Sequence, residues 1–372
     1  MNLSVQVEER TFFKRVDLNF ALVILALNFV GLINLYSASH NDQSGTSQIF
    51  YLQIVWLTVG WLIYFFLTII DYKFFSRIAW IIYGLNLMSL AAVTFVGKTY
   101  YGAQRWLDLG FFRYQPSETM KLALILILAK VLGKQRYDGG MGLKDLLFPL
   151  ALTGVPFLFT VRQPDLGTAL MFLAIAGSMM IFVRVKTRIL VLVAIVAAIA
   201  IPVAWQFGLK EYQKKRVLTF VYPGKDPRGA GYNSIQSKIA VGSGKVLGKG
   251  FRKGTQSQLE FLPERHTDFI FSVLSEEHGF IGSITTVSLF AVLFLMAIRI
   301  ASQARERFGA IMTVGILSFI FWHMFVNVGM VIGILPIVGV PLPLLSYGGS
   351  ILIATMVGLG LISSVSYRRY LF

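Results

Sequence analysis

Residues 189–207 read ILVLVAIVAAIAIPVAWQF, nineteen positions without a charge. As an α-helix this stretch is about 28 Å long, close to the roughly 30 Å thickness of a bilayer's hydrocarbon core. Backbone polar groups in lipid must be bonded within their own segment, so a run of this kind predicts a transmembrane helix.

Further apolar stretches lie on both sides of this one. The chain is 56% hydrophobic and 14% charged, with a mean hydropathy of +0.68, which excludes an ordinary soluble domain. We expect an all-α integral membrane protein, a single polytopic domain over residues 1–372. The stretch at 146–161 contains two prolines, which makes its limits the hardest to place. The ten expected transmembrane helices cover residues 17–37, 50–70, 78–96, 115–133, 146–161, 166–183, 189–207, 269–298, 308–330 and 345–366.

Basic residues indicate the orientation. Lys and Arg occur in the tail before residue 16 and after every second span, which places them on one side of the expected membrane. On the other side, loops 38–49 and 331–344 have no Lys or Arg. Loops rich in Lys and Arg are cytoplasmic, so we expect both termini in the cytoplasm. The same rule accounts for the formal net charge of +16, and we expect no nucleic-acid partner.

The segment 208–267, between the seventh and eighth spans, is the exception. It is expected outside the cytoplasm, yet it carries twelve basic and four acidic residues, a net charge of +8. Long loops cross the membrane regardless of charge, so the topology stands. We expect this large basic loop to bind an anionic lipid headgroup or a pyrophosphate.

Three acids open helices at the outward-facing side. Glu118 lies in QPSETMK (115–121), three residues before Lys121, while Asp165 ends QPD and Asp268 ends HTD. Residues 341–350, PLPLLSYGGS, precede the last span and include Ser346, a further candidate. The helix starts point their positive dipole ends outward, which favours an anion there.

Each of these residues has a structural alternative. Asp165 and Asp268 would serve as helix N-caps. Glu118 and Lys121 would form an ion pair between packed helices. His266 would act as a hydrogen-bond partner, and Arg105, followed by a tryptophan, would anchor its loop or contact a headgroup.

Other motifs give no cofactor site. The chain has no cysteine, and its four histidines form no metal-binding pair at helical spacing, so metal ligands stay unknown. The segment GSGKVLGKG (242–250) has the wrong spacing for a phosphate-binding loop and is expected to be flexible. Glu276 and Glu277 are expected to serve packing.

Without a nucleotide motif, a reaction at the outer face needs an activated substrate, and a lipid-linked sugar pyrophosphate is one. Positive charges would stabilise its leaving group. The acceptor hydroxyl is a weak nucleophile, so a carboxylate must take its proton. We expect Asp268 to be that base, with its pKa lowered by the basic neighbourhood.

The motifs together resemble the shape, elongation, division and sporulation (SEDS) family of membrane glycosyltransferases. The resemblance runs over essentially the whole chain. The short tail and GTQSQLEFL (254–262) are closer to the RodA branch than to the FtsW branch. The quoted motifs are GAQRWLDLG (102–110), QPSETMK (115–121), QPDLGT (163–168), LPERHTDFI (262–270) and PLPLLSYGGS (341–350).

This resemblance implies a peptidoglycan polymerase of the bacterial cytoplasmic (inner) membrane. The enzyme would join lipid II units through β-1,4 links during cell elongation, with inversion and release of undecaprenyl pyrophosphate. Asp268 matches the family's essential aspartate, and Glu118, Lys121 and Asp165 match further important positions. The implied partners are a class B penicillin-binding protein of the PBP2 type and the rod-shape elongation complex. A divalent cation, Mg²⁺ or Mn²⁺, is compatible with a pyrophosphate substrate.

Two alternatives come from other functional classes. A transporter that flips lipid II would also use polar residues and a basic vestibule, but its site is expected near the membrane midplane. A non-catalytic scaffold of the cell-wall elongation complex would leave the acids unexplained.

Overall fold

Each of the ten apolar stretches coincides with a helix. The computed structural model describes residues 16–41, 45–100, 103–108, 110, 113–134, 139–208, 211–222, 230–259 and 261–369. Within them, seven helices are long and apolar enough to cross a membrane, and α7 and α8 are shorter apolar helices. The chain is therefore mostly helical, as expected. The helices at the ten stretches are α2 (Leu18–Ser39), α3 (Gln48–Ile69), α4 (Tyr72–Val96), α5 (Pro116–Lys134), α6 (Leu143–Arg162), α7 (Leu166–Phe182), α8 (Thr187–Val203), α12 (Ile270–Ser302), α13 (Arg307–Val331) and α14 (Gly349–Arg368).

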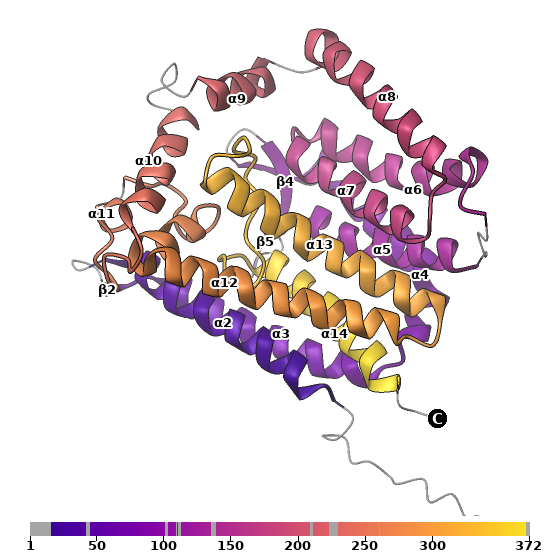
Figure 1. Ribbon diagram of the computed structural model, residues 1–372, viewed down its shortest axis with the longest axis horizontal. Helices are drawn as coiled ribbons and strands as arrows, with labels where there is room; N and C mark the ends of the chain where they lie inside the picture. The colour runs from indigo at the N-terminus through magenta and orange to yellow at the C-terminus, as the bar shows by residue number, and fades with distance from the viewer. Residues whose placement is uncertain are drawn as a thin grey trace, which may run out of the picture.

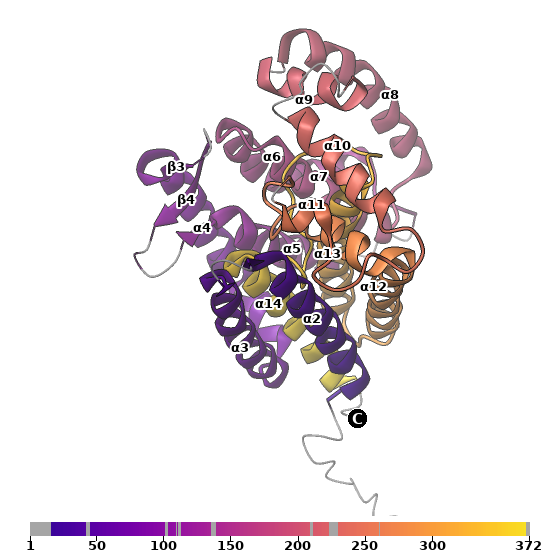
Figure 2. The same cartoon turned by 90° about the vertical axis from the view of Figure 1, so that its left-hand side faces the viewer.

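Small elements fill the connections. Strands β1 (His40–Asn41) and β2 (Gly45–Thr46) form an antiparallel pair. Strands β3 (Lys98–Tyr100), β4 (Ala103–Asp108) and β5 (Arg113–Tyr114) form an antiparallel sheet between α4 and α5. Figure 2 shows β3 and β4 projecting beyond the end of α4.

The basic segment 208–267 is partly helical rather than a plain loop. The π-helix η1 (Ala204–Gly208) ends at the first residue of this segment. Three helices follow within it: α9 (Glu211–Val221), α10 (Ala230–Ser243) and α11 (Thr255–Gln258). Residues 209–210, 223–229 and 260 lie outside the described residues, and with them Lys210, Lys225 and Arg228.

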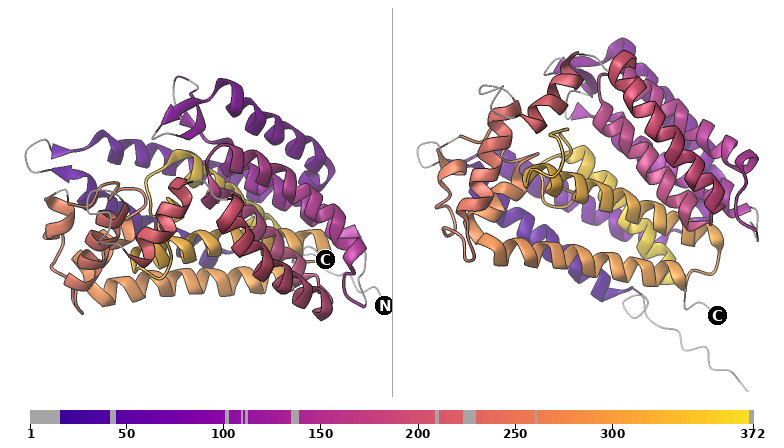
Figure 3. Two further views of the ribbon diagram at one scale, coloured as in Figure 1. Left: turned by 90° about the horizontal axis from the view of Figure 1, so that it is seen from above. Right: turned by 45° about the horizontal axis from the view of Figure 1, so that its top comes forward.

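Helix α5 forms the centre of the bundle. It packs against α4, α6, α7, α13 and α14. Side chains along its length from Pro116 to Leu132 are buried. Apart from the buried Glu118 and Lys121 near its start, the buried side chains of α5 are mostly apolar, as expected for a helix surrounded by others. At the edge of the bundle, α8 leaves most of its apolar side chains exposed. In both views of Figure 3 its ribbon passes in front of other helices, at the outside of the bundle.

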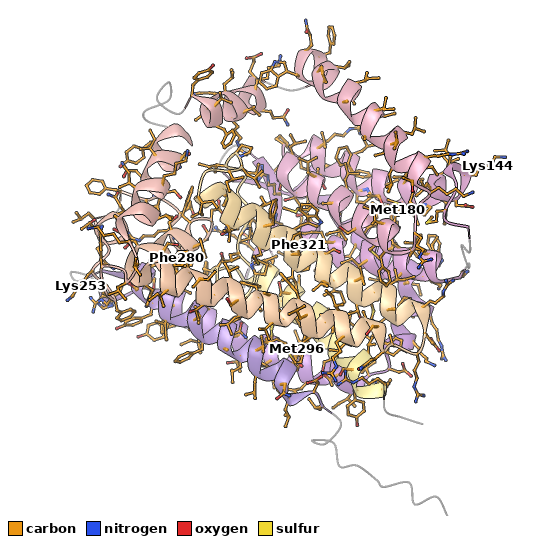
Figure 4. The ribbon with its side chains drawn as sticks, viewed as in Figure 1. Lys144, Met180, Lys253, Phe280, Met296 and Phe321 are labelled. Atoms are coloured by element: carbon orange, nitrogen blue, oxygen red, sulfur yellow. The ribbon has the colours of Figure 1, made fainter. Side chains whose placement is uncertain are left out.

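The two ends of the bundle differ. Helices α10 and α11 and the β1–β2 pair lie on the left of Figure 1, at what we call the loop end. Helix α14 finishes at the opposite end, here called the terminal end. In Figure 4, Lys253 and Phe280 lie at the loop end and Lys144 at the terminal end.

Helix α6 continues through both of its prolines. Pro156 has no N–H, so the carbonyl of Leu152 one turn earlier loses its helical partner. The hydroxyl of Tyr83 on α4 donates to that carbonyl at 2.7 Å. A neighbouring helix thus satisfies the freed group, and the span is 20 residues long rather than the shorter stretch expected.

Helix α12 bends sharply at Gly279, where φ is 64° and ψ is −157°. The hydroxyl of Ser283 donates to that of Ser275, eight residues earlier, at 2.9 Å. In a straight helix this spacing corresponds to about 12 Å of rise. Residues 270–278 therefore lie alongside the start of the long segment 280–302.

The glycine-rich segment 244–250 replaces the hydrogen bonds that this bend interrupts. The amides of Lys249 and Gly250 donate to the carbonyls of Glu276 and Glu277, both at 3.0 Å. In return, the amides of the two residues after Gly279 donate to carbonyls in the same segment at 2.9 and 3.1 Å. The expectation of a flexible loop was wrong, because this segment is bonded into the bend of α12.

Candidate functional site

Asp268 lies in the turn that leads into α12 and is partly buried. The alternative of a simple helix cap is wrong, because the N-cap of α12 is Phe269 and makes no side-chain capping bond. A Cβ atom at Gly339 would lie 3.3 Å from Oδ2 of Asp268, so the carboxylate faces the backbone of the segment between α13 and α14. Gly339 has a φ of +72°, a conformation that favours glycine.

The backbone around Asp268 is bonded by three separate parts of the fold. Four carbonyl oxygens of residues 266–270 accept a hydrogen bond from outside the turn. These bonds fix the peptide units on both sides of the carboxylate. The donors are Tyr347 N to His266 O at 2.9 Å, Ser346 Oγ to Thr267 O at 2.7 Å, Asn327 Nδ2 to Asp268 O at 2.8 Å and Asn34 Nδ2 to Ile270 O at 2.8 Å.

Two candidates from the sequence, Ser346 and His266, take part in these bonds around Asp268. Ser346 is buried, and its hydroxyl also accepts from the amide of Leu342 at 2.8 Å. His266 lies against Tyr347, with ring centroids 6.2 Å apart. Burial lowers the pKa of His266, which favours its neutral form. Ser346 bonds to the turn that carries Asp268, and His266 is part of that turn.

The electrostatics of Asp268 differ from the sequence expectation. The pKa of Asp268 is raised to about 7, mainly by burial and in addition by the nearby Glu264. Arg216 and Arg105 lower it, and Asp165 raises it. The basic neighbourhood is thus present, but loss of water outweighs it. A carboxyl group with a pKa near neutral is matched to proton transfer at neutral pH.

Asp165 makes two kinds of interaction, a helix cap and an ion pair. As the N-cap of α7 it accepts from the amide of Thr168 at 3.2 Å and from its hydroxyl at 2.9 Å. It also pairs with Arg105 of β4, with 3.4 Å between Oδ2 and Nε. Arg105 donates in addition to the carbonyl of Pro164 at 2.5 Å. Asp165 therefore caps α7, and its ion pair also brings Arg105 to the start of that helix.

Glu118 and Lys121 form a buried ion pair in the first turns of α5. Lys121 Nζ lies 2.8 Å from Glu118 Oε1 and 2.8 Å from His323 Nε2 on α13. His323 Nδ1 lies 2.9 Å from the carbonyl of Phe319, which only accepts. Nδ1 therefore carries the proton and Nε2 accepts from Lys121. The ion pair expected between packed helices therefore lies within α5, and it is the bond from Lys121 to His323 that joins α5 to α13.

Part of the basic loop has structural partners. Lys249 pairs with the fully buried Glu276 at 2.7 Å, and this carboxylate also accepts from the start of α11. Glu276 was expected to serve packing. In the structure its carboxylate forms an ion pair with Lys249 and caps the start of α11. Arg265 donates to the carbonyls of Ala38 and Ser257 at 2.8 and 2.6 Å.

Arg216 of α9 occupies a different environment. It lines a small cavity together with Thr219, Phe220, Ser234 and Ile337. It is also one of the charges that lower the pKa of Asp268. Arg216 is therefore a loop cation near the candidate base, and sequence reasoning did not single it out.

Metal ligands are not gathered in this region. Among the described residues, no three His, Cys, Asp or Glu side chains lie close enough to hold an ion together. The divalent cation compatible with a pyrophosphate substrate thus has no three-residue protein site among the described residues.

Sequence reasoning missed Asn34, Asn327 and the role of His323. A signal existed, since polar side chains within membrane helices are costly and tend to be functional. Unlike the acids, these three side chains lie within helices, away from the short motifs at the helix starts.

Comparison with known proteins finds relatives that match nearly the whole chain. A model of the FtsW, RodA and SpoVE family, described as cell cycle protein, matches residues 17–371. The chain is 40% identical to peptidoglycan glycosyltransferase MrdB of Escherichia coli K12, covering 97% of this chain and 96% of that protein. It is 32% identical to peptidoglycan glycosyltransferase RodA of Treponema pallidum, covering 95% and 98%.

Two solved structures have a similar fold. One is a chain from a study of how a peptidoglycan synthase complex coordinates polymerization and crosslinking. It has a TM-score of 0.81 and 31% identity, covering 95% of this chain and 98% of that one. The other is the rod shape determining protein RodA of Thermus thermophilus, with a TM-score of 0.71, 29% identity and the same coverage.

Proposed function

This chain belongs to the FtsW, RodA and SpoVE family and is a peptidoglycan glycosyltransferase, and from that premise we propose that Asp268 is the general base in the polymerisation of lipid II. The observation that carries this proposal is the placement of its carboxylate. It is partly buried, has a pKa raised to about 7, and lies in a turn bonded from three directions.

In the proposed reaction, a sugar hydroxyl of the acceptor attacks the anomeric carbon of the donor. The new C–O bond forms as the bond to the pyrophosphate oxygen breaks, and the electron pair leaves with undecaprenyl pyrophosphate. The hydroxyl proton passes to a carboxylate oxygen of Asp268. Direct displacement inverts the anomeric centre, which gives the β-1,4 link from an α-linked donor.

The leaving group requires positive charge at the site. Arg105 and Arg216 are near enough to Asp268 to lower its pKa, and a pyrophosphate in the same region would interact with them. Asp165 holds Arg105 by its ion pair, so we assign Asp165 a supporting role. Mg²⁺ or Mn²⁺, where it takes part, would enter with the pyrophosphate.

We place this chemistry at the outer face of the bacterial cytoplasmic membrane. The proposal uses ten transmembrane helices, with both termini in the cytoplasm and segment 208–267 outside. It is supported by the absence of Lys and Arg from the sequence of loops 38–49 and 331–344. The chain has no cysteine, so single introduced cysteines test it cleanly. An impermeant maleimide should label Lys253→Cys, and not Ser302→Cys, in intact spheroplasts.

We propose a class B penicillin-binding protein, within the rod-shape elongation complex, as the partner. One similar solved chain comes from a peptidoglycan synthase complex that couples polymerization to crosslinking. Family membership favours an enzyme over the transporter and scaffold alternatives. Copurification of this chain with a transpeptidase of that class tests the partnership.

The decisive experiment for the base uses purified protein, its partner and labelled lipid II. Asp268→Asn removes the base while preserving size, and we expect glycan synthesis to fall by about 10²–10⁴-fold. Glu211→Gln is the matched control, since Glu211 lies in the same basic segment with a side chain that is 95% exposed. Full activity of Asp268→Asn in folded protein would exclude the proposed base.

A further inference from the structure

Asn327 of α13 makes an unusual pair of hydrogen bonds. Its side chain is fully buried, and Nδ2 donates to the carbonyl of Asp268 and to that of Val340, each at 2.8 Å. An amide nitrogen has two hydrogens, so both are used. One side chain therefore joins the turn before α12 to the segment between α13 and α14.

These two segments face each other across the carboxylate of Asp268. Gly339, next to Val340, is the backbone position that Oδ2 of Asp268 approaches. The bonds of Asn327 thus set the separation between the peptide unit of Asp268 and the backbone that its carboxylate faces. A change at Asn327 would alter this separation without removing any group from the site.

The buried side chain of Asn327 carries an energetic cost. Its Oδ1 atom is buried and has no hydrogen-bond partner in the described part of the chain. A buried amide with an unsatisfied oxygen is costly in a helix otherwise rich in apolar residues. Leucine would remove the unpaired Oδ1 atom, but it would leave the carbonyls of Asp268 and Val340 without this donor. The two donated bonds are what asparagine adds.

The other donors to the turn act on neighbouring residues. Ser346 and Tyr347 bond to the carbonyls before Asp268, and Asn34 bonds to the carbonyl of Ile270. Asn327 bonds to the carbonyl of Asp268 itself. A displacement there moves the base most directly.

We propose that Asn327 is a positioning residue for glycan polymerisation, which fixes the peptide of Asp268 against the Gly339–Val340 backbone. The inference rests on the proposed role of Asp268 as the base. Asn327 contacts no reacting atom in this proposal and acts only through the geometry of its neighbour.

The test compares three variants with lipid II as substrate. Asn327→Ala removes both bonds, and Asn327→Asp keeps the shape but replaces the donating nitrogen by an oxygen. We expect each to lower kcat by about 10²-fold, the effect of a displacement of about 1 Å, with KM changed less than threefold. The control is Asn28→Ala on α2. Asn28 is a buried helical asparagine whose amide atoms have no partner in the described residues, and this variant should retain kcat.

Hydrogen exchange supplies a readout that does not depend on catalysis. In Asn327→Ala, we expect faster exchange in residues 262–270, including the amides of Thr267 and Phe269 that bond to the carbonyl of Glu264. Should the alanine variant fail to accumulate, Asn327→Ser takes its place in both measurements, because the shorter serine side chain cannot reach both carbonyls.

The outcomes separate the two proposals. Faster exchange with a lower kcat supports positioning. An unchanged kcat, or a loss of activity through KM with exchange unaltered, overturns it. If Asp268→Asn remains active, the base assignment fails separately, and the exchange data still decide whether Asn327 fixes this turn.

Discussion

Lys121 on α5 donates a hydrogen bond to His323 on α13 at 2.8 Å, between two buried side chains. Asn327, which bonds to Asp268, lies one helical turn beyond His323. The ion pair of Glu118 and Lys121 is thus connected to the candidate base through a single helix. We therefore expect changes at Glu118 or Lys121 to act on Asp268 through α13 rather than through contact with substrate.

The first prediction concerns the stability of this pair. Lys121→Met leaves the Glu118 carboxylate buried without its cation, and we expect the variant to lose about 3–5 kcal/mol of stability. Adding Glu118→Gln removes the unpaired charge, so the double variant should regain much of the loss. Thermal unfolding in detergent measures both. Equal unfolding temperatures for the single and double variants would show that the two residues are not coupled.

A second prediction follows from the pKa of about 7 at Asp268. The base acts in its ionised form, so kcat/KM should rise with pH through about 7 and level off above it. Glu264→Gln removes a like charge and should shift this rise to lower pH. Arg216→Gln removes an opposite charge and should shift it to higher pH.

Lys253→Gln is the control for these profiles. Lys253 is an exposed cation of the same basic segment and is not among the charges that shift Asp268. Its profile should coincide with that of the unmodified protein. Shifts in the same direction for Glu264→Gln and Arg216→Gln would contradict the assignment of the rise to Asp268.

The sequence was sufficient to predict where the apolar helices lie and that Glu118 and Asp165 lie at helix starts. Each prediction has a physical reason. Apolar runs locate spans because lipid imposes length and composition. Glu118 and Asp165 lie in or next to the first turn of a helix, and capping preferences are local. The family resemblance extended these local signals to a function, which comparison with known relatives confirmed.

What the sequence could not give depends on contacts between distant segments. The pKa of Asp268 was expected to fall because nearby cations are visible in sequence, whereas burial is not. Asn327 bonds to a residue 59 positions away, and no spacing rule predicts that contact. The segment 244–250 was taken as flexible because its partner, the bend at Gly279, forms only in three dimensions.

The third prediction tests that bend. Gly279→Ala would place a Cβ atom 2.3 Å from the amide nitrogen of Gly248, at a φ that disfavours other residues. We expect a loss of at least about 1–3 kcal/mol, the strain of such a backbone conformation, and a lower unfolding temperature. Gly242→Ala on α10 is the matched control, since nothing lies within 4 Å of its Cβ position. Equal tolerance of both changes would argue against the bend.

The last prediction separates the structural from the functional cations of the basic segment. Lys249→Met leaves Glu276 fully buried without its ion pair, so stability should fall while KM for lipid II in the remaining folded protein stays the same. Arg216 is exposed, so Arg216→Gln should raise KM several-fold at an unchanged unfolding temperature. The two variants each remove one positive charge from the same segment. If net charge alone attracted the substrate, both would raise KM equally, so a difference between them locates the pyrophosphate beside Arg216 rather than over the whole loop.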